Sequence, residues 1–335
     1  MTEPLIQFVR STGTLIGFLA VAFCAIGLGQ EKTPAAAPQI EKTAELRAVA
    51  FLEKEVPAWR PSNGCYSCHN NGDGVRALLI AKRARLPVEP AAISESIEFL
   101  KQPKAWDTNG PEGPFNDRQL ARVQFASALA TTVRTGAVQD RQPLIDAAEK
   151  LAADQSASGE WKFSGEDAIG SPVTLGRPLA TATALQVLRL ADGERFAKQI
   201  AAAETWLTDF NAQSVLNSAA VVLGLAECST PAAADQRTRC LTLIRSSQND
   251  DGGWGPYLNS PPEPFDTAIV LCALANQPRS QWGQAINAGR EFLRRSQLPN
   301  GSWPETTRPA GRDSYAQWIA TTAWATIALI ETREK

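Results

Sequence analysis

A seven-residue pattern recurs three times and constrains the fold more than any other feature of the chain. It consists of Gln, three residues, Gly, one residue and Trp, and its copies are Gln155-Gly159-Trp161, Gln248-Gly252-Trp254 and Gln297-Gly301-Trp303. Gln248 lies 93 residues after Gln155 and 49 residues before Gln297. A period of this length is typical of repeat proteins, in which each unit is one supersecondary motif.

Each copy of the pattern separates two helical segments. Apolar residues recur at helical spacing before the three copies, over 144–153, 238–247 and 288–296. A second run rich in Ala, Thr and Leu follows each copy after a loop, over 177–191, 265–276 and 315–331. Less regular units of the same kind occupy 48–55 with 74–85, 93–102 with 118–132, and 201–207 with 215–228. The sequence therefore predicts an all-α fold of about six helix pairs.

With these motifs the chain resembles the prenyltransferase/squalene-oxidase repeat family, and its Gln-Gly-Trp turns are similar to the QW motifs of class II terpene cyclases. A single helix pair cannot bury its own apolar face, so stacked pairs complete one another's core. The resemblance implies a closed α/α toroid over residues 45–335, with alternating outer and inner helices around a central cavity. It also implies that the motif residues are structural and that each tryptophan braces a turn between an outer and an inner helix.

The catalytic features of that family are absent from the sequence. Class II cyclases protonate an alkene with an acid from an Asp-x-Asp-Asp motif, and the most similar string here, Asn249-Asp250-Asp251, lies inside a QW turn. Only 7% of the residues are aromatic, which leaves few π faces to stabilise a carbocation. The prenyltransferase branch holds zinc with a late histidine, whereas the one histidine of this chain is His69. We therefore expect neither an active cyclase nor a zinc site.

Polar residues at the starts of the inner helices form a candidate cavity rim. The resemblance implies that these helix starts lie at the mouth of the cavity. The residues concerned are Arg118, Arg177, Asp266, Thr267, Tyr315 and Trp318. Each of them also fits a helix cap or a solvated loop end. Together they predict a polar-rimmed pocket that takes a small apolar molecule.

Cys65-Tyr-Ser-Cys68-His69 is the one motif of the chain that carries chemistry of its own. Cys-x-x-Cys-His is the attachment signature of c-type haem. The two thiols bond to the vinyl groups on one edge of the porphyrin, and the imidazole of the next residue ligates the iron. The motif precedes the first inner helix and predicts one covalent haem c at Cys65, Cys68 and His69, with His69 as the metal ligand.

Three alternatives to haem attachment stay open for this motif. It can occur by chance, or act as a redox dithiol whose thiolate the helix start favours. Structural zinc is the weakest alternative, because Cys68 and His69 are adjacent and no second ligand pair exists. The chain has one histidine and one methionine, the initiator. The sixth iron position would therefore be open or filled by water, a lysine, an asparagine or a partner protein.

The remaining cysteines are less informative. Cys228 and Cys240 end one inner helix and begin the next outer helix, so a disulfide between them and two free buried thiols both fit the sequence. Cys272 lies in an apolar run and is most simply a core residue.

Residues 1–30 have the pattern of a signal peptide or N-terminal anchor. Arg10 precedes an uncharged, largely apolar stretch over 11–29, which is short for a membrane-spanning helix. A buried N-terminal helix is the alternative. Residues 31–44, rich in Ala and Pro, are predicted to be a linker. The segment predicts export to the periplasm or another extracytoplasmic compartment, with membrane contact only through an uncleaved N-terminus.

Charge excludes one class of partner and leaves several functions. The 33 Lys and Arg residues nearly balance the 35 Asp and Glu residues, and no basic run suited to nucleic acid occurs. The sequence favours an exported monohaem c-type redox protein, built on a squalene-cyclase-like toroid and served by a redox partner protein. The alternatives are a protein that binds or converts a terpenoid or other apolar molecule in the cavity, and a non-catalytic interaction scaffold.

Overall fold

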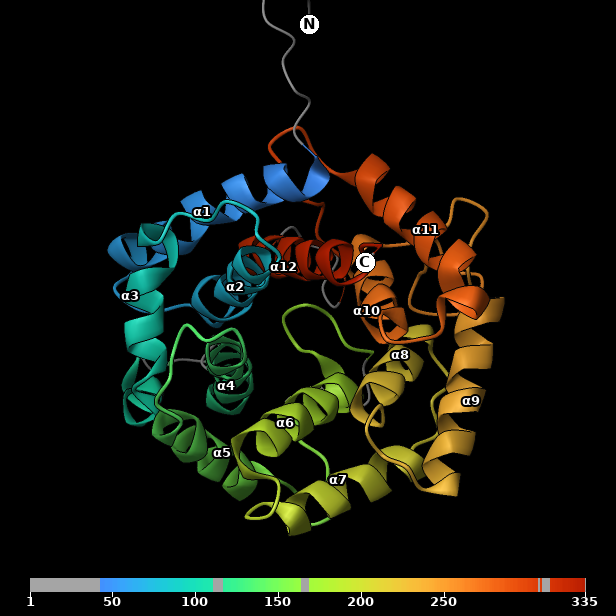
Figure 1. The fold of residues 1–335 in the computed structure, drawn as a ribbon, viewed down its shortest axis with the longest axis horizontal. Helices are drawn as coiled ribbons and strands as arrows, with labels where there is room; N and C mark the ends of the chain where they lie inside the picture. The colour runs from blue at the N-terminus through green and yellow to red at the C-terminus, as the bar shows by residue number, and fades with distance from the viewer. Residues whose placement is uncertain (1–42, 111–116, 164–168, 307, 309–313, 335) are drawn as a thin grey trace, which may run out of the picture. The chain divides into compact units, whose positions relative to one another are not determined.

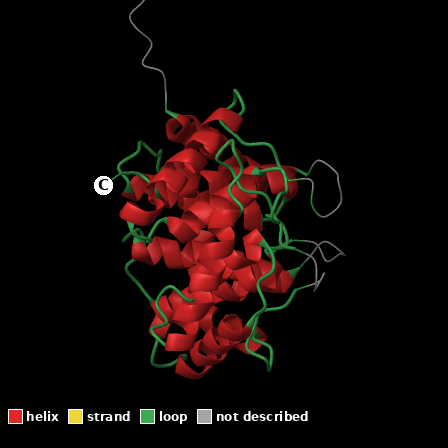
Figure 2. Cartoon of the chain, turned by 90° about the vertical axis from the view of Figure 1, so that its right-hand side faces the viewer, coloured by secondary structure: helices red, strands yellow, loops and turns green. Residues whose placement is uncertain are grey.

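The computed structural model describes residues 43–110, 117–163, 169–306, 308 and 314–334. The predicted signal peptide or anchor at 1–30 lies outside these residues, as does almost all of the predicted linker at 31–44. The described residues form twelve α-helices, one π-helical segment and one 3-10 segment, and none of them belongs to a strand (Figure 2). Within the same residues no helix combines the length and the apolar character that crossing a membrane requires.

The helices alternate along the chain between two sets. The first set is α1 (Ala44–Asn63), α3 (Ala91–Leu100), α5 (Gln142–Asp154), α7 (Ala197–Asp209), α9 (Pro231–Ser246) and α11 (Arg279–Ser296). The second set is α2 (Val75–Arg83), α4 (Arg118–Arg134), α6 (Gly176–Asp192), α8 (Val215–Gly224), α10 (Pro264–Leu274) and α12 (Tyr315–Glu331). The π-helical η1 (Cys68–Gly74) runs directly into α2, and the 3-10 segment η2 (Pro103–Thr108) follows α3.

The first set forms an outer ring and the second set an inner ring (Figure 1). Each inner helix packs against the inner helices before and after it, and α12 packs against α2, which completes the circle. The prediction of an all-α, α/α toroid of six helix pairs is therefore confirmed.

Side-chain burial explains why the two sets differ. In the outer helix α5 the buried residues are Leu144, Ala147, Ala148 and Leu151, a single stripe at helical spacing. In the inner helix α12 every residue from Ile319 to Ile330 is buried. An outer helix thus needs one apolar face, while an inner helix is covered on nearly all sides by its neighbours.

Each QW turn ties together two outer helices and one inner helix. Gln155 Nε2 donates to the backbone carbonyl of Gln199 at 2.9 Å, so the glutamine joins its own turn to the next outer helix, α7. The fully buried Trp161 donates from Nε1 to the Leu151 carbonyl on α5 at 2.8 Å. Its backbone N–H donates to Thr181 Oγ1 on α6 at 3.0 Å. Through these bonds the turn contacts α5, α6 and α7.

The last QW turn closes the ring. Gln248 Nε2 donates to the Ala285 carbonyl on α11 at 2.9 Å, which repeats the bond made by Gln155. Gln297 Nε2 donates in the same way to the Ala44 carbonyl at 2.9 Å, but here the next outer helix is α1. The same hydrogen bond therefore joins consecutive repeats and also joins the last repeat to the first.

The first outer helix is longer than the sequence predicts. The predicted segment ends at residue 55, whereas α1 continues to Asn63 with Pro57 and Pro61 inside it. A proline within a helix removes a hydrogen bond and costs stability. Trp59, which stacks on Tyr315 with ring centroids 5.4 Å apart, contacts α12 from the part beyond Pro57. Tertiary contact thus outweighs the local preference of proline.

Candidate functional site

The inner helices enclose a cavity of about 260 Å³. Its exposed lining residues include Arg83, Arg134, Gln186 and Asn276, which lie in the C-terminal parts of inner helices or just beyond them. Its buried walls are formed by Ile80, Leu179, Ala182, Trp324 and Ile327. The cavity therefore opens at the C-terminal ends of the inner helices, and its wall combines these buried apolar side chains with the polar Arg76 and Thr183.

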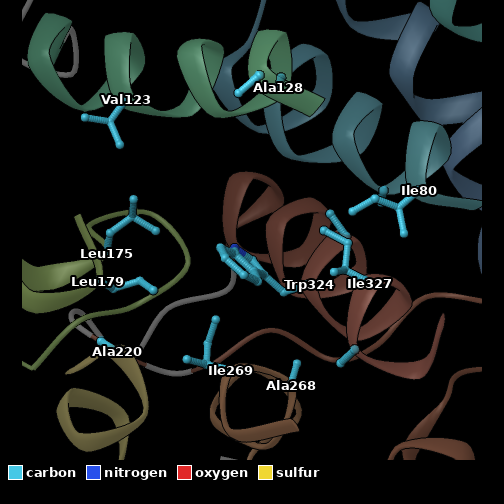
Figure 3. Packing of buried hydrophobic residues seen from close by; sticks show 14 of the residues in the cluster. Ile80, Val123, Ala128, Leu175, Leu179, Ala220, Ala268, Ile269, Trp324 and Ile327 are labelled. Atoms are coloured by element: carbon cyan, nitrogen blue, oxygen red, sulfur yellow. The ribbon is translucent and has the colours of Figure 1, made fainter. Parts of the chain in front are cut away.

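Leu175 lies beside the central space, directly before the N-terminal end of α6. Figure 3 shows Leu175 and Leu179 beside the central space, across from Trp324. Leu175 has φ 56° and ψ −34°, and the Gly176 N–H donates to the Thr174 carbonyl at 2.6 Å, which makes a three-residue γ-turn. A positive φ is costly for leucine, yet this side chain is only 2% exposed. The strained turn thus places an apolar side chain at the end opposite the mouth.

Thr267, a predicted rim residue, belongs to a QW turn. It is fully buried, and its Oγ1 accepts the backbone N–H of Trp254 at 2.9 Å. Thr181 and Thr322 hold Trp161 and Trp303 in the same way, at 3.0 and 3.2 Å. A threonine on each of these three inner helices therefore holds the QW turn that precedes the helix.

Asp266, also predicted at the rim, is a fully buried carboxylate. Its Oδ1 lies 2.9 Å from Arg308 Nη2, and Glu263 lies 3.0 Å from the same guanidinium. Burial raises the pKa of Asp266 to about 7, although Arg308 acts in the opposite direction. Asp266 Oδ2 has no hydrogen-bond partner among the described residues.

Tyr315 and Trp318 make contacts between elements. The Tyr315 hydroxyl donates to Glu55 Oε2 and accepts from Asn70 Nδ2, both at 2.9 Å, and so joins α12 to α1 and η1. Trp318 Nε1 donates to Ser302 Oγ at 2.8 Å. Both side chains help to close the ring rather than to line its centre.

The predicted rim residues do not lie at the mouth that the structure shows. Arg177 lies 4.0 Å from the Glu160 carboxylate, and Arg118 is exposed at the start of α4. With Asp266, Thr267, Tyr315 and Trp318 they belong to the N-terminal ends of inner helices, whereas the cavity opens at the C-terminal ends. Their role as a cavity rim therefore stays a prediction.

The Cys-x-x-Cys-His motif begins the first inner helix, as its position in the sequence predicts. Ser67 Oγ accepts the backbone N–H groups of His69 and Asn70 at 3.1 and 3.2 Å and caps η1. Cys65 remains in the preceding loop, and Cys65 and Cys68 are free thiols. Single π-helical turns of this kind are frequent at functional sites.

His69 lies in a buried polar network. Its Nδ1 is 3.2 Å from Gln124 Nε2, which donates to Asp73 Oδ2 at 2.7 Å. Burial disfavours the imidazolium, but Cys68 and Asp73 outweigh this effect and raise the pKa of His69 to about 10. Asp73 Oδ1 is in turn 3.8 Å from Arg76 Nη1, and Arg76 lines the cavity. The network thus connects the motif to the cavity wall.

The other cysteines of the described residues, Cys228, Cys240 and Cys272, are also free thiols. Cys228 and Cys240 are buried and not bonded to each other, which decides between the two alternatives for this pair. Cys272 is partly exposed and lines the cavity, and burial raises the pKa of its thiol to about 12. It is therefore a wall residue of the cavity as well as part of the apolar helix α10.

Three arginines of the cavity were missed by sequence reasoning. Arg76 and Arg83 are seven residues apart on α2, so they share one face of an otherwise apolar helix. That spacing was an available signal, because a charged residue on an inner helix must face either a partner or a cavity. Arg134, at the end of α4, carries no comparable signal.

Solved structures with the same arrangement of helices include type II terpene cyclases. A variant of MstE from Scytonema bound to its substrate, geranylgeranyl dihydroxybenzoate, matches with a TM-score of 0.56 and 18% identity, over 86% of this chain and 96% of that chain. A variant bound to its product, merosterolic acid A, matches at 0.55 and 18%, over 86% and 95%. A protein from Actinoplanes matches at 0.54 and 19%, over 86% and 98%. The likeness shows a class II cyclase-like α/α toroid.

Sequence similarity to a curated protein covers a small part of the chain. Drimenyl diphosphate synthase from Streptomyces showdoensis is 34% identical over 73 residues, which are 22% of this chain and 14% of that protein. The chain thus matches about a seventh of the length of that relative. No protein-family model matches the chain.

The main functional prediction from the sequence, a monohaem redox protein, is wrong. The similar proteins are a terpene cyclase and a terpenoid diphosphate synthase, which favour the alternative of an apolar ligand in the cavity. Sequence reasoning gave the Cys65-Cys68-His69 motif more weight than the cavity at the centre of the ring. Haem attachment, export and the partner assignments stay predictions.

Proposed function

We propose that the protein binds an isoprenoid, or a similarly elongated apolar molecule, in its central cavity. MstE acts on geranylgeranyl dihydroxybenzoate, and the similar synthase is named for drimenyl diphosphate. These names suggest the ligand class, but one fold supports many functions. The proposal therefore depends on the cavity itself.

The composition of the cavity wall carries the proposal. Ile80, Leu179, Trp324 and Ile327 come from three inner helices and surround the same central space (Figure 3). Apolar walls combined with polar groups that can orient a ligand are the usual form of a small-molecule site, and this cavity has both. Sites for small molecules commonly begin near 300 Å³, so a cavity of about 260 Å³ favours a short chain such as farnesyl.

Binding fits the structure better than cyclisation. Glu263-Pro264-Phe265-Asp266 has acids at the first and fourth positions of an Asp-x-Asp-Asp pattern, but phenylalanine at the third. Asp266 is not among the described residues that line the cavity. Its pKa of about 7 makes it a weaker acid than an ordinary carboxyl group, whereas protonation of an alkene needs a strong one. We therefore expect no proton-initiated conversion by Asp266, and product analysis after incubation with isoprenoids tests this expectation.

Filling the cavity tests the proposed function. Cys272→Phe places a ring in the space that Cys272 lines. We expect the wild-type protein to bind farnesol in a calorimetric titration and Cys272→Phe to bind it at least about tenfold more weakly, a loss of about 1.4 kcal/mol. Ser246→Phe is the control, because it adds the same ring to an exposed position on the outer helix α9.

Circular dichroism and thermal unfolding establish that both variants are folded. Equal farnesol affinity in the wild type, Cys272→Phe and Ser246→Phe would place the ligand outside the cavity and contradict the proposal. No farnesol binding by the wild-type protein would contradict it as well.

A further inference from the structure

We infer that the mouth of the cavity binds the anionic head group of the ligand through Arg76, Arg83 and Arg134. This inference rests on the proposed function and narrows the ligand class to isoprenoids with a diphosphate or carboxylate head. All three arginines line the same cavity. Glu331 is the one carboxylate among the described residues that line it. The described lining therefore carries three positive charges and one negative charge.

Of the three arginines, Arg134 has the positive charge that is least balanced by a nearby carboxylate. It lies at the C-terminal end of α4, and its Nη2 is 3.4 Å from Thr131 Oγ1 on its own helix. It forms no ion pair with any residue in the described part of the chain. Partial burial, and then the positive charges of Arg76 and Arg83, lower the pKa of Arg134. The arginines are thus close enough to repel one another, and an anion between them would relieve that repulsion.

Arg83 and Arg76 have partners that leave room for a ligand. Arg83 Nη2 lies 2.5 Å from Glu331 Oε1 at the exposed mouth. Arg76 lies deeper, with its side chain 11% exposed and its Cζ 4.0 Å from the centre of the Trp324 ring. Its ion pair with Asp73 is long, at 3.8 Å. The guanidinium of Arg76 therefore stands between the polar mouth and the aromatic wall.

Helix stabilisation alone does not account for the three charges. An arginine in the last turn of a helix offsets the partial negative charge of the free carbonyl groups, which explains Arg83 on α2 and Arg134 on α4. Arg76 lies two turns before the end of α2 and is largely buried, and burying a guanidinium is unfavourable unless it is well paired. An anionic ligand in the cavity would explain why Arg76 lies in its wall.

The arrangement fixes the direction of the ligand. A diphosphate or carboxylate at the mouth accepts hydrogen bonds from Arg134 and Arg83, and Gln186 and Asn276 offer further donors beside them. The apolar chain then passes Trp324 and extends toward Leu179. Tail-first entry leaves the charged head close to water, so most of its hydration is kept.

The test compares three ligands that share one apolar chain. Farnesyl diphosphate, farnesoic acid and farnesol are titrated into the full chain by calorimetry at low and at high salt. We expect at least one of the two anions to bind about tenfold more tightly than farnesol at low salt, and the difference to shrink at high salt. The stronger of the two anions identifies the head group as diphosphate or carboxylate.

Three charge-neutralising variants, one of them a control, locate the effect. Arg134→Gln should lower the ratio of anion affinity to farnesol affinity to near one, because it removes one of the three positive charges at the mouth. Lys82→Gln is the matched control, because Lys82 is exposed on α2 beside Arg83 and is not among the described lining residues. Arg83→Gln provides a second variant with the expected direction of Arg134→Gln.

Three outcomes would overturn the inference. Equal affinity for all three ligands, or an anion preference that Arg134→Gln leaves intact, contradicts the anionic head site but keeps the proposed function. No binding of any of the three ligands contradicts both. Loss of anion preference in Lys82→Gln to the same extent as in Arg134→Gln assigns it to general surface charge.

Discussion

Asp266 is a carboxyl group that the folded chain makes harder to ionise. It is fully buried at the start of α10, where Arg308 is its ionic partner and one carboxylate oxygen lacks a hydrogen bond among the described residues. Loss of water around a carboxylate disfavours its charged form, and here this effect exceeds the attraction of Arg308 and raises the pKa of Asp266 to about 7. The charge of this residue is therefore a cost to stability at neutral pH.

Asp266→Asn should flatten part of the pH dependence of stability. Between the ordinary carboxyl pKa of 3.8 and about 7, the folded chain holds the proton and the unfolded chain does not. The contribution of Asp266 is therefore fully present below pH 3.8 and is lost as pH rises to about 7, by about 1.4 kcal/mol per pKa unit. Urea unfolding of both proteins from pH 4 to pH 8 measures this. Parallel curves for the wild type and Asp266→Asn would contradict the assignment.

Single residues differ in how far the sequence reveals their roles. The glutamines, glycines and tryptophans of the QW turns were predictable, because three copies at regular spacing share one local purpose. The role proposed for Arg134 was not, because it depends on Arg76, Arg83 and Glu331, which the fold brings together from distant parts of the chain. The prominent Cys65-Cys68-His69 string led to the wrong main function, since a local match outweighed evidence that only the assembled cavity supplies.

The QW turn is the element that sets the spacing of the ring. Its glycine adopts a left-handed conformation, with φ 90° at Gly252 and 93° at Gly301. A Cβ at Gly252 would lie 2.5 Å from the Ala288 carbonyl oxygen on α11, and one at Gly301 would lie 2.3 Å from the Arg47 carbonyl oxygen on α1. Glycine is needed because the turn both reverses the chain and lies directly against the next outer helix.

Gly252→Ala should destabilise the protein by about 2–4 kcal/mol, because it combines backbone strain with a steric clash against α11. Gly283→Ala is the matched control, since a Cβ at Gly283 in α11 meets nothing within 4 Å. The control should raise stability by about 0.5–1 kcal/mol, as alanine favours a helix more than glycine does. Urea unfolding measures both. Equal effects of the two substitutions would contradict the role given to the turn.

Helices were predictable where their apolar periodicity is strong. The predicted segment 315–331 coincides with α12, and 177–191 differs from α6 by one residue at each end. Where proline interrupts the pattern, the prediction fell short, because Pro57 and Pro61 suggested an end to α1 that contacts with α12 override. The local sequence thus predicts helices that are stabilised by their own residues. It does not predict helical turns that depend on contacts with neighbouring helices.

At the scale of the whole molecule, six repeats form a ring that encloses the cavity. The family resemblance implied the toroid and its cavity, and the bond from Gln297 to the Ala44 carbonyl closes the ring. The resemblance did not give the open end. The strained turn at Leu175 lies beside the central space at the start of α6, and arginines line the cavity at the C-terminal ends of α2 and α4. The turn at Leu175 is not visible in the sequence, whereas the spacing of Arg76 and Arg83 on α2 is.

The central claim is that an isoprenoid lies inside the ring, and photo-crosslinking tests it most directly. A farnesyl probe that carries a diazirine is bound to the full chain and irradiated, and the labelled peptides are identified by mass spectrometry. We predict labelling of the inner helices at Leu179, Trp324 and Ile327, which excess unlabelled farnesol suppresses. Labelling confined to the outer helices, or labelling that farnesol does not suppress, would contradict the account.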